Sequence, residues 1–404
     1  MNRRQFLATA STTAAVSLAA PARSLGQTPA SPLYEPSDHR QLLSQIIHGL
    51  PKAELHIHFE GLLEAADIIR LNRKNKVGLP YASVEDVLQR FYTIRDLPTF
   101  IEVYEGFASV LVEEADYYDL AWRFFVRSQQ QGVRRIEMFI GPQLHQGRSL
   151  SQNEVVGILD QAARDAEAEL GLSVAYILGF HRNRPSAEAM DLLKDSDAVR
   201  DKLIGIGLDH PEVEGFPQKF AEVYQRAREM GFRLTAHCDV NQPESYLHIR
   251  DCIEVLGVER IDHGVNTVDR PELVALAKER GIGFTPCPTI RFSPEGLGRT
   301  YLKIVTAKLR KMRELGLRAM INTDDPGLMA SAYLNDVYHF TADDLGWGVD
   351  DLTALAKASF EVSWMSDAAK EKQYQAIDTY VAAMLKPQTT FRPEPLAPAY
   401  RRDA

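Results

Sequence analysis

The chain has 404 residues, of which 45% are hydrophobic and 25% charged, and it carries a formal net charge of −9. This composition is typical of a globular protein, and the negative charge argues against nucleic acid or an anionic membrane as a general partner. Three cysteines, Cys238, Cys252 and Cys287, are too few and too scattered for a disulfide framework or a zinc knuckle.

The N-terminus has the pattern of an export signal. The adjacent Arg3 and Arg4 precede a weakly apolar run rich in Ala, Ser and Thr, which ends at Ala20-Pro21-Ala22. This order is typical of a secretory signal, and the paired arginines resemble a twin-arginine signal, which exports folded proteins. The run is too short and too rich in small residues for a membrane-spanning helix. We predict a signal over 1–26 and an exported, periplasmic or extracellular protein; the alternative is a disordered basic N-terminus.

From residue 50 onward, short apolar segments alternate with long amphipathic ones. Eight segments have the length and composition of strands: 53–59, 133–140, 173–180, 203–210, 233–240, 260–265, 281–288 and 318–326. Helical spacing of apolar residues fills the intervals, for example at 151–170, 216–230, 244–256 and 270–280. Glycines expected to end helices are Gly132, Gly171, Gly231, Gly281 and Gly316. The alternation favours a (β/α)8 TIM-type barrel over an open doubly wound sheet.

Two regions add to this basic alternation. The interval 61–132 is long enough for several helices, one of them capped by Ser83, which would lie over the mouth of the barrel. The segment after Pro326 is predicted to be helical through about residue 385. We therefore predict one barrel domain over 27–386, followed by a Pro-rich tail over 387–404.

Two histidines lie on the first predicted strand. Successive side chains of a strand alternate between its faces, so His56 and His58 point the same way and their apolar neighbours point the other. Two imidazoles on one face, at the C-terminal end of a strand, can share one divalent metal. The pattern alone is a common chance match, so this interpretation depends on the other strands.

Chemically suitable side chains recur at the predicted ends of four strands. Barrel enzymes place catalytic residues there, and these positions hold His56, His58, His237, His263, Asp324 and Asp325. Three imidazoles and a carboxylate fit a mononuclear zinc-like site with room for a water, whose pKa such a metal lowers towards neutrality. Of the adjacent Asp324 and Asp325, one can bind metal while the other orients the water or accepts its proton. His263 would polarise that water.

Four stretches carry a resemblance to a known family: 51–61, His237, Asp262-His263-Gly264 and Asn322-Thr323-Asp324-Asp325-Pro326. Over roughly residues 45–370 the chain resembles the adenosine/adenine deaminase family of the amidohydrolase superfamily. The resemblance implies a (β/α)8 barrel, one zinc ion and hydrolytic removal of an exocyclic amino group from a purine-like ring. The metal ligands that it implies are His56, His58, His237 and Asp324.

The resemblance also implies roles beyond the metal ligands. His263 and Asp325 would handle the attacking water, and Glu60 falls where the family uses an acidic residue towards the sugar or the purine edge. The alternatives are a buried, hydrogen-bonded histidine for His263 and a helix N-cap ahead of Pro326 for Asp325.

The fifth strand departs from the family pattern. The family usually has His-Ala-Gly-Glu, with the Glu as the acid that protonates the ring nitrogen, whereas this chain has His237-Cys238-Asp239-Val240. A valine cannot transfer protons. Asp239 is two residues from His237 and would share its face, which makes it the candidate replacement; the alternatives are that it orients His263 or binds substrate. Glu212 and Glu244 are less favoured.

The segments expected to contact the substrate also differ from the family pattern. The family's Asp-Leu-Ala-Gly is replaced by Asp209-His210-Pro211-Glu212, in which Asp209 is the expected substrate contact and Glu212 stands at the glycine position. The segment 287–291 lacks the family's usual Ser or Asn after Cys-Pro. His181, Arg182 and His210 fall near strand ends and either line the pocket or serve as caps. Adenosine itself therefore does not follow as the substrate.

The sequence predicts an exported, metal-dependent deaminase that acts on adenosine, adenine or a related heterocycle. Its partners would be one Zn²⁺, with iron or manganese as alternatives, and a small-molecule purine base or nucleoside. One rival is an amidohydrolase that cleaves another C–N bond on the same scaffold. The other is a non-catalytic periplasmic protein that binds metal or purine.

Overall fold

The computed structural model describes residues 36–238, 244–289, 297–329 and 332–386. Its strands are β1 (Lys52–His58), β2 (Val133–Ile140), β3 (Ser173–His181), β4 (Leu203–Asp209), β5 (Arg233–Cys238), β6 (Arg260–His263), β7 (Gly283–Thr285) and β8 (Arg318–Ala319). They form one parallel sheet in which each strand pairs with the next in sequence. The predicted signal, the tail over 387–404 and residues 239–243 lie outside the described residues.

The ends of the sheet meet through the segment that follows β8. Ile57 and Asp324 form a parallel bridge. The amide of Asp324 donates to the carbonyl of His56 at 3.1 Å, and the amide of His58 donates to the carbonyl of Asp324 at 3.0 Å. This closure makes the sheet a (β/α)8 barrel, as predicted, and it holds Asp324 beside the two histidines of β1.

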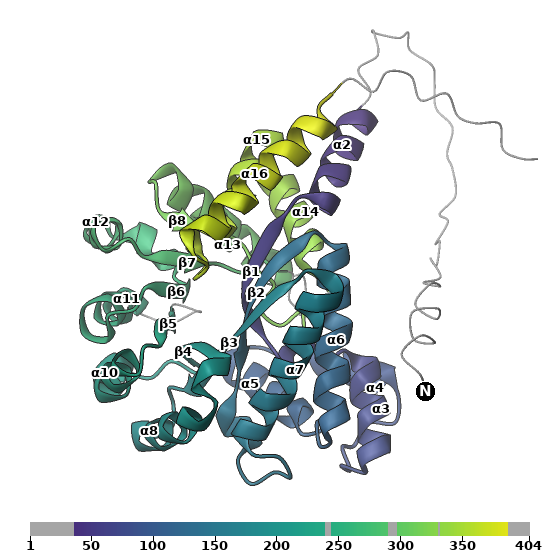
Figure 1. The fold of residues 1–404 in the computed structure, drawn as a ribbon, viewed down its shortest axis with the longest axis vertical. Helices are drawn as coiled ribbons and strands as arrows, with labels where there is room; N and C mark the ends of the chain where they lie inside the picture. Colours follow the sequence, from purple (N-terminus) through teal and green to yellow (C-terminus); the bar gives the residue numbers. More distant parts are fainter. Residues whose placement is uncertain (1–35, 239–243, 290–296, 330–331, 387–404) are drawn as a thin grey trace, which may run out of the picture. The chain divides into compact units, whose positions relative to one another are not determined.

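Helices follow the strands and surround the sheet (Figure 1). Those before β5 are α2 (Pro36–Gly49), α3 (Ala65–Asn75), α4 (Val84–Phe91), α5 (Leu97–Ala108), α6 (Glu114–Gln130), α7 (Gln152–Leu170), α8 (Ser186–Asp195), α9 (Phe216–Lys219) and α10 (Ala221–Glu229). Those after β5 are α11 (Ser245–Asp251), α12 (Pro271–Arg280), α13 (Leu297–Glu314), α14 (Leu334–Leu345), α15 (Val349–Val362) and α16 (Asp367–Met384). Short 3₁₀ or π helices occur at Glu60–Leu62, Pro142–His145, Ser196–Lys202, Cys252–Leu256 and Val265–Asp269.

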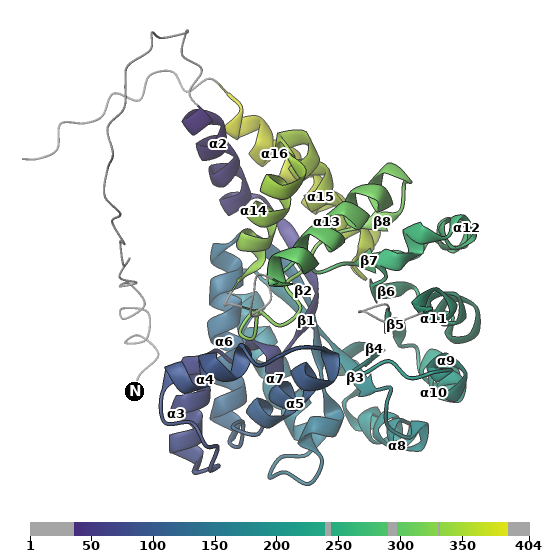
Figure 2. The same cartoon turned by 180° about the vertical axis from the view of Figure 1, so that it is seen from behind.

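The predicted insertion after the first strand contains four helices, α3 to α6. Figure 2 shows α3, α4 and α5 gathered on one side of the barrel. Ser83 caps α4 as predicted, because its hydroxyl accepts from the amide of Asp86 at 3.2 Å and the Asp86 carboxylate accepts from the amide of Ser83. The helix α5 is the one that reaches the site described below.

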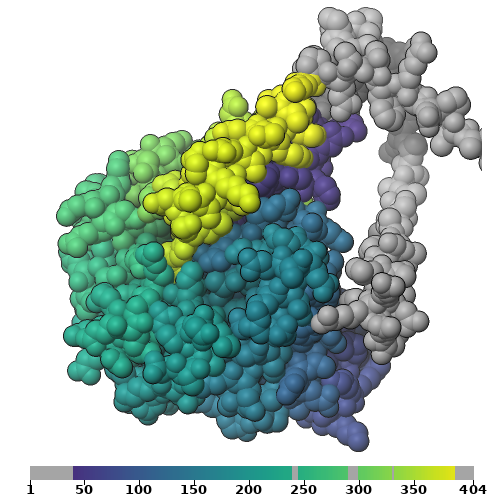
Figure 3. Space-filling model, viewed as in Figure 1, coloured from purple at the N-terminus to yellow at the C-terminus, as the bar shows by residue number. Residues whose placement is uncertain are grey.

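The C-terminal helices cover the opposite part of the sheet. In Figure 3 the yellow helix α16 lies on the surface next to the purple α2. The hydroxyl of Tyr380 on α16 donates to the carbonyl of Gln45 on α2 at 2.8 Å. No helix in the described ranges is both long enough and apolar enough to cross a membrane.

The strands bury both of their faces, as parallel sheets under helices do. On β1 the apolar Ala53, Leu55 and Ile57 belong to the hydrophobic core. The residues between them, Lys52, Glu54, His56 and His58, are buried as well and are all polar or charged. Since strand side chains alternate, the second set points into the barrel, and the interior is therefore unusually polar.

Some predicted boundaries were wrong. The strands β7 and β8 are shorter than the predicted 281–288 and 318–326. Pro286 and Pro288 have no amide to donate to a neighbouring strand, and Asp324 has a positive φ of 66° that no strand residue adopts. The predicted helix 244–256 ends in a π-helical turn, Cys252–Leu256. The predicted helix ends are confirmed, because all five named glycines have positive φ.

Candidate metal centre and active site

Four of the predicted residues meet at the C-terminal end of the barrel. His56 and His58 come from β1, His237 comes from β5, and Asp324 follows β8. Each offers one ligand atom, all four atoms lie within 4.8 Å of one another, and all four residues are buried. Residues distant in sequence are brought together because parallel strands of a barrel end at the same rim.

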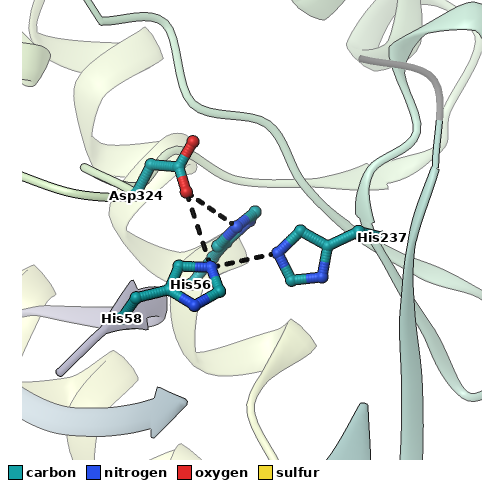
Figure 4. Close-up of side chains that lie close together, drawn as sticks. All are labelled: His56, His58, His237 and Asp324. Carbon is teal, nitrogen blue, oxygen red and sulfur yellow. Dashed lines mark hydrogen bonds and ion pairs between the residues drawn. The ribbon is translucent and has the colours of Figure 1, made fainter. Parts of the chain in front are cut away.

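Three of the distances between these atoms are close to those between ligands of one metal ion (Figure 4). Nε2 of His58 lies 3.1 Å from Nε2 of His237 and 3.6 Å from Oδ1 of Asp324. The same Oδ1 lies 3.3 Å from Nε2 of His56. Metal–nitrogen bonds of about 2.0–2.1 Å in tetrahedral geometry separate neighbouring ligand atoms by about 3.3 Å. The four side chains therefore fit one divalent metal ion.

The other ring nitrogen of each histidine faces an acceptor. Nδ1 of His56 lies 3.0 Å from the carbonyl of Thr285, and Nδ1 of His237 lies 2.9 Å from the carbonyl of Leu208. Nδ1 of His58 lies 3.8 Å from Oδ2 of Asp209. Acceptors at Nδ1 place the proton there and leave the Nε2 lone pair for a metal. The buried Nε2 of His56 faces Oδ1 of Asp324 across the centre of the cluster.

The electrostatics of the cluster also favour a bound cation. Burial opposes ionisation of Asp324, but the neighbouring His56, His263 and His58 hold the pKa of its carboxyl well below its usual range. Burial and the surrounding imidazoles hold the pKa of His237 well below the usual value, so its ring is neutral at pH 7. The Asp324 carboxylate and the neutral His237 ring are forms that ligate a divalent metal, whereas, despite burial, Asp324 raises the pKa of His56, which a metal would need in its neutral form.

His263 and Asp325 lie beside the ligand cluster. Nε2 of His263 is 3.7 Å from Oδ2 of Asp324, and both His263 and Asp325 line the pocket that opens above the cluster. Asp325 caps no described α-helix, because the next one, α14, begins at Leu334. His263 and Asp324 both have positive φ, 62° and 66°. Such backbone is costly for residues with side chains and is frequent at functional sites.

Gly61 makes room for the Asp325 carboxylate. A Cβ atom at Gly61 would lie 2.0 Å from Oδ1 and 2.7 Å from Cγ of Asp325. Any larger residue there would have to displace the carboxylate. The sequence placed Gly61 next to the histidines but gave no sign of this contact, which depends on the closure between β1 and the segment after β8.

One wall of the pocket is an apolar helix face. Leu97, Phe100, Ile101 and Tyr104 of α5 line it at three- and four-residue spacing, together with Met329. The polar lining comes from the strand ends: His58, Arg182, Asp209, His210, His237, His263, Asp324 and Asp325. An apolar wall facing a polar floor suits a flat heterocycle with a hydrogen-bonding edge.

The predicted substrate contact Asp209 lines this pocket. Burial opposes its ionisation, but His210, His181 and His58 lower its carboxyl pKa to about 2. Its Oδ1 lies 2.7 Å from Nδ1 of His210. A Cβ at Gly179 would lie 2.3 Å from Oδ2 of Asp209, so this carboxylate also depends on a glycine.

The predicted substrate contact Glu60 lies deeper than the pocket lining. Its carboxylate accepts from Nε2 of His145 at 2.9 Å, from the hydroxyl of Tyr104 at 3.0 Å and from the amide of Gly141 at 3.2 Å. Burial opposes its ionisation, but these donors, His145 first, lower its carboxyl pKa. Tyr104 lines the pocket and links Glu60 to it. A direct contact of Glu60 with substrate stays a prediction.

The candidate proton donor, Asp239, belongs to a segment that the structure does not describe. Asp239 and Val240 lie outside the described residues, as do Ile290 and Arg291. Of the less favoured candidates, Glu212 is buried, with Oε1 2.6 Å from Nδ1 of His248 and Oε2 3.9 Å from a guanidinium nitrogen of Arg182.

The chain matches the family model described as adenosine deaminase over residues 51–380. It is 37% identical over 342 residues to the adenine deaminase of Geotalea uraniireducens, an alignment that covers 84% of this chain and 94% of the relative. It is also 37% identical over 341 residues to an uncharacterized deaminase of Schizosaccharomyces pombe, covering 84% of this chain and 98% of the relative.

Solved structures show the same fold. The crystal structure of an adenine deaminase from Arthrobacter aurescens superposes with a TM-score of 0.75 at 30% identity, covering 83% of this chain and all of that one. A zinc-bound amidohydrolase from Burkholderia ambifaria superposes with a TM-score of 0.75 at 26% identity, covering 85% of this chain and 94% of that one.

Proposed function

The chain belongs to the adenosine deaminase family, and on that premise we propose that it hydrolytically removes the exocyclic amino group of adenine or a closely related purine. The observation that carries the proposal is the convergence of His56, His58, His237 and Asp324 at the spacing of a metal coordination sphere. We propose Zn²⁺ as the ion, which agrees with the zinc-bound neighbour and with the donor set.

His56, His58, His237 and Asp324 would hold the divalent metal, which when bound would lower the pKa of a water towards neutrality. The Asp325 carboxylate, which occupies the space that the missing side chain of Gly61 leaves, accepts a proton from the attacking water. His263, beside Asp324, stabilises the charge that develops on the attacking oxygen. The water oxygen bonds to the ring carbon, and the proton that Asp325 accepted passes to the exocyclic nitrogen. The C–N bond then breaks, ammonia leaves, and the second proton of the water restores the acid that protonated the ring nitrogen.

The ring nitrogen next to the attacked carbon must take up a proton, and we assign this role to Asp239. The assignment rests on the sequence, since Asp239 is two residues from His237 and Val240 cannot act. Asp239→Asn should lower kcat by about 10²–10⁴, while the control Glu244→Gln should leave it unchanged. Unchanged turnover in Asp239→Asn would remove Asp239 from the mechanism.

The pocket favours an uncharged base or nucleoside over a nucleotide. Three of its lining residues are carboxylic acids, Asp209, Asp324 and Asp325, which would repel a phosphate. Arg182, the one arginine among the described lining residues, donates to the carbonyls of His210 and His237. The relatives named adenine deaminases place adenine first among the candidates.

The test is ammonia release by the purified, metal-loaded chain across adenine, adenosine, their N6- and 2-substituted relatives, aminopterins and cytosine. We expect turnover of adenine or of one substituted aminopurine. Silence across this panel, with one metal bound per chain, would favour the second candidate, a hydrolase for another C–N bond. That candidate is motivated by Val240 at the usual position of the acid.

We also propose that residues 1–26 direct export of the folded, metal-loaded protein. The support is the Arg3-Arg4 pattern and the small-residue run that follows it. Fractionated cells should contain a shortened chain outside the cytoplasm, and Arg3→Lys with Arg4→Lys should retain the full-length chain inside. A full-length wild-type chain in the cytoplasm would contradict export.

A further inference from the structure

A buried carboxylate, Asp262, lies next to the proposed metal ligands without belonging to them. It is fully buried on β6. The strand register places it level with His237 on β5 and with Thr285 on β7. Register partners of a parallel sheet point to the same face, so Asp262 faces the barrel interior together with a ligand histidine. Neither the ligand set nor the proposed chemistry gives this carboxylate a role.

Hydrogen bonds connect Asp262 to the ligand His56 through a threonine. Oγ1 of Thr285 donates to Oδ1 of Asp262 at 2.8 Å. A hydroxyl has one proton to donate, so Oγ1 of Thr285 can then only accept from Nδ1 of His56, which lies 3.1 Å away. The same Nδ1 lies 3.0 Å from the carbonyl of Thr285, which is also an acceptor. The proton of His56 therefore lies on Nδ1, and its Nε2 presents a lone pair to the cluster.

The second oxygen of Asp262 lies near another ligand. Oδ2 accepts from Oγ1 of Thr235 at 2.6 Å and lies 3.6 Å from Nδ1 of His237. On the side away from the cluster, Nε of the buried Arg260 lies 3.5 Å from Oδ1 of Asp262. The negative charge thus lies between a buried cation and two ligand histidines. A carboxylate in this position fixes the orientation of ligand histidines and raises their affinity for a metal.

We propose that Asp262 is a positioning residue of the metal centre. Through the hydroxyl of Thr285 it fixes the tautomer and the orientation of His56, and its charge supports metal binding by His56 and His237. The inference rests on the proposed metal centre and extends it to residues that would not touch the ion. The alternative is a carboxylate that serves only as a partner of the buried Arg260.

The test is the Kd for Zn²⁺ of the untagged full chain, measured by competition with a chelator of known affinity. Asp262→Asn keeps the shape of the side chain, removes its charge and should raise the Kd by about 10–100-fold. Thr285→Val removes the hydroxyl between Asp262 and His56 and should raise the Kd by about 10-fold.

The matched control is Thr235→Val. Thr235 is as fully buried as Thr285 and donates to the same carboxylate, but its hydroxyl bonds to Asp262 and to the carbonyl of Arg260 rather than to a proposed ligand. The carbonyl of Leu208, 2.9 Å from Nδ1, holds His237 independently of this hydroxyl. Thr235→Val should therefore keep the wild-type Kd within about threefold.

A spectrum of bound Co²⁺ separates positioning from general stability. The visible absorption bands of Co²⁺ depend on the geometry of its ligands, so they report the orientation of His56 directly. Asp262→Asn and Thr285→Val should shift these bands, whereas Thr235→Val should give the wild-type spectrum. A change that only loosens the packing of the barrel would not separate the two threonine variants in this way.

Two results would overturn the role of Asp262. One is a wild-type Kd and Co²⁺ spectrum in both Asp262→Asn and Thr285→Val, which would leave Asp262 as a partner of Arg260 alone. The other is equal weakening in all three variants, which would show a general effect of packing. Should Asp262→Asn fail to fold, the comparison of the two threonine variants decides.

The metal centre itself is tested by the wild-type chain in the same titration. A wild-type chain that binds no Zn²⁺ would overturn the metal centre and, with it, the role of Asp262. One bound ion in wild type with unchanged affinity in the variants would overturn the role of Asp262 alone. Both readouts follow the metal, so a failed deamination assay does not affect them.

Discussion

The two ends of the barrel bury charged groups in different ways. At the ends where strands begin, the charges have protein partners: Glu137 accepts from Arg135, from Arg260 at 2.6 Å and from the amide of Trp364 at 2.8 Å. Lys52 donates to three backbone carbonyls. At the ends where strands finish, the four ligand atoms face one another instead. The charges of the first end are paired within the protein, whereas we propose that a cation completes the second end.

The largest effect is expected from removing a proposed metal ligand. Asp324→Ala removes the only carboxylate among the four proposed ligands and should abolish metal binding, lowering kcat/KM by about 10⁴-fold or more. Metal analysis and ammonia release on the same preparation measure both. A variant that keeps half of the wild-type turnover would contradict the assignment of the site.

The matched change at the other end should affect stability instead. Glu137→Gln leaves the fully buried Arg260 with only the more distant carboxylate of Asp262, 3.5 Å away, and should lower the free energy of unfolding by about 3–5 kcal/mol. Turnover per folded chain should stay within about threefold, because no group of the pocket changes. Denaturant unfolding and active-site titration separate the two quantities.

The loss of stability in Glu137→Gln should depend on pH. Burial opposes ionisation of Glu137, but Arg135 and Arg260 hold the pKa of its carboxyl below the usual value. A carboxyl with a lowered folded-state pKa contributes stability above its unfolded pKa and loses it as the pH falls through the folded-state pKa. The difference in free energy of unfolding between wild type and Glu137→Gln should therefore become smaller below about pH 4.5. A gap that stays constant or widens on acidification would contradict the charge pairing.

A smaller effect is expected from the contact between Gly61 and Asp325. Gly61→Ala should displace the Asp325 carboxylate and lower kcat by about 100-fold, with metal content unchanged. Gly157→Ala is the control, because a Cβ there meets nothing within 4 Å. A Gly61→Ala enzyme with wild-type kcat would show that the position of Asp325 is not critical.

The smallest predicted effect concerns the link between the pocket wall and Glu60. Tyr104→Phe removes the hydroxyl that donates to Glu60 at 3.0 Å and should cost about 1 kcal/mol, seen as a KM roughly fivefold higher. Steady-state kinetics with the best substrate of the panel measures it. A change confined to kcat would move Tyr104 from substrate positioning to the chemical step.

Much of the fold and of the ligand set follows from the sequence. Strand–helix alternation is a periodic signal, so β2 was predicted at its observed bounds, Val133–Ile140. The proposed ligands His56, His58, His237 and Asp324 could be predicted because each lies at or near the end of a strand. In a barrel the ends of the strands lie close together.

Contacts between distant turns could not be predicted in this way. The fit of Asp325 against Gly61 depends on the closure between the first and last strands. The engagement of Glu60 by Tyr104 and His145 depends on how the inserted helix α5 and the turn after β2 pack on β1. Sequence spacing carries no information about such packing, so it did not indicate that Tyr104 and His145 hold the Glu60 carboxylate.

The central claim is that one metal in the histidine–aspartate cluster makes this chain a deaminase. The most direct test removes the metal with a chelator, returns Zn²⁺ in steps, and measures ammonia release from adenine or the best substituted aminopurine against bound metal. The account predicts no turnover by the metal-free chain and a linear rise that ends at one ion per chain. Full turnover without metal, or none at one ion per chain with any substrate of the panel, would contradict it.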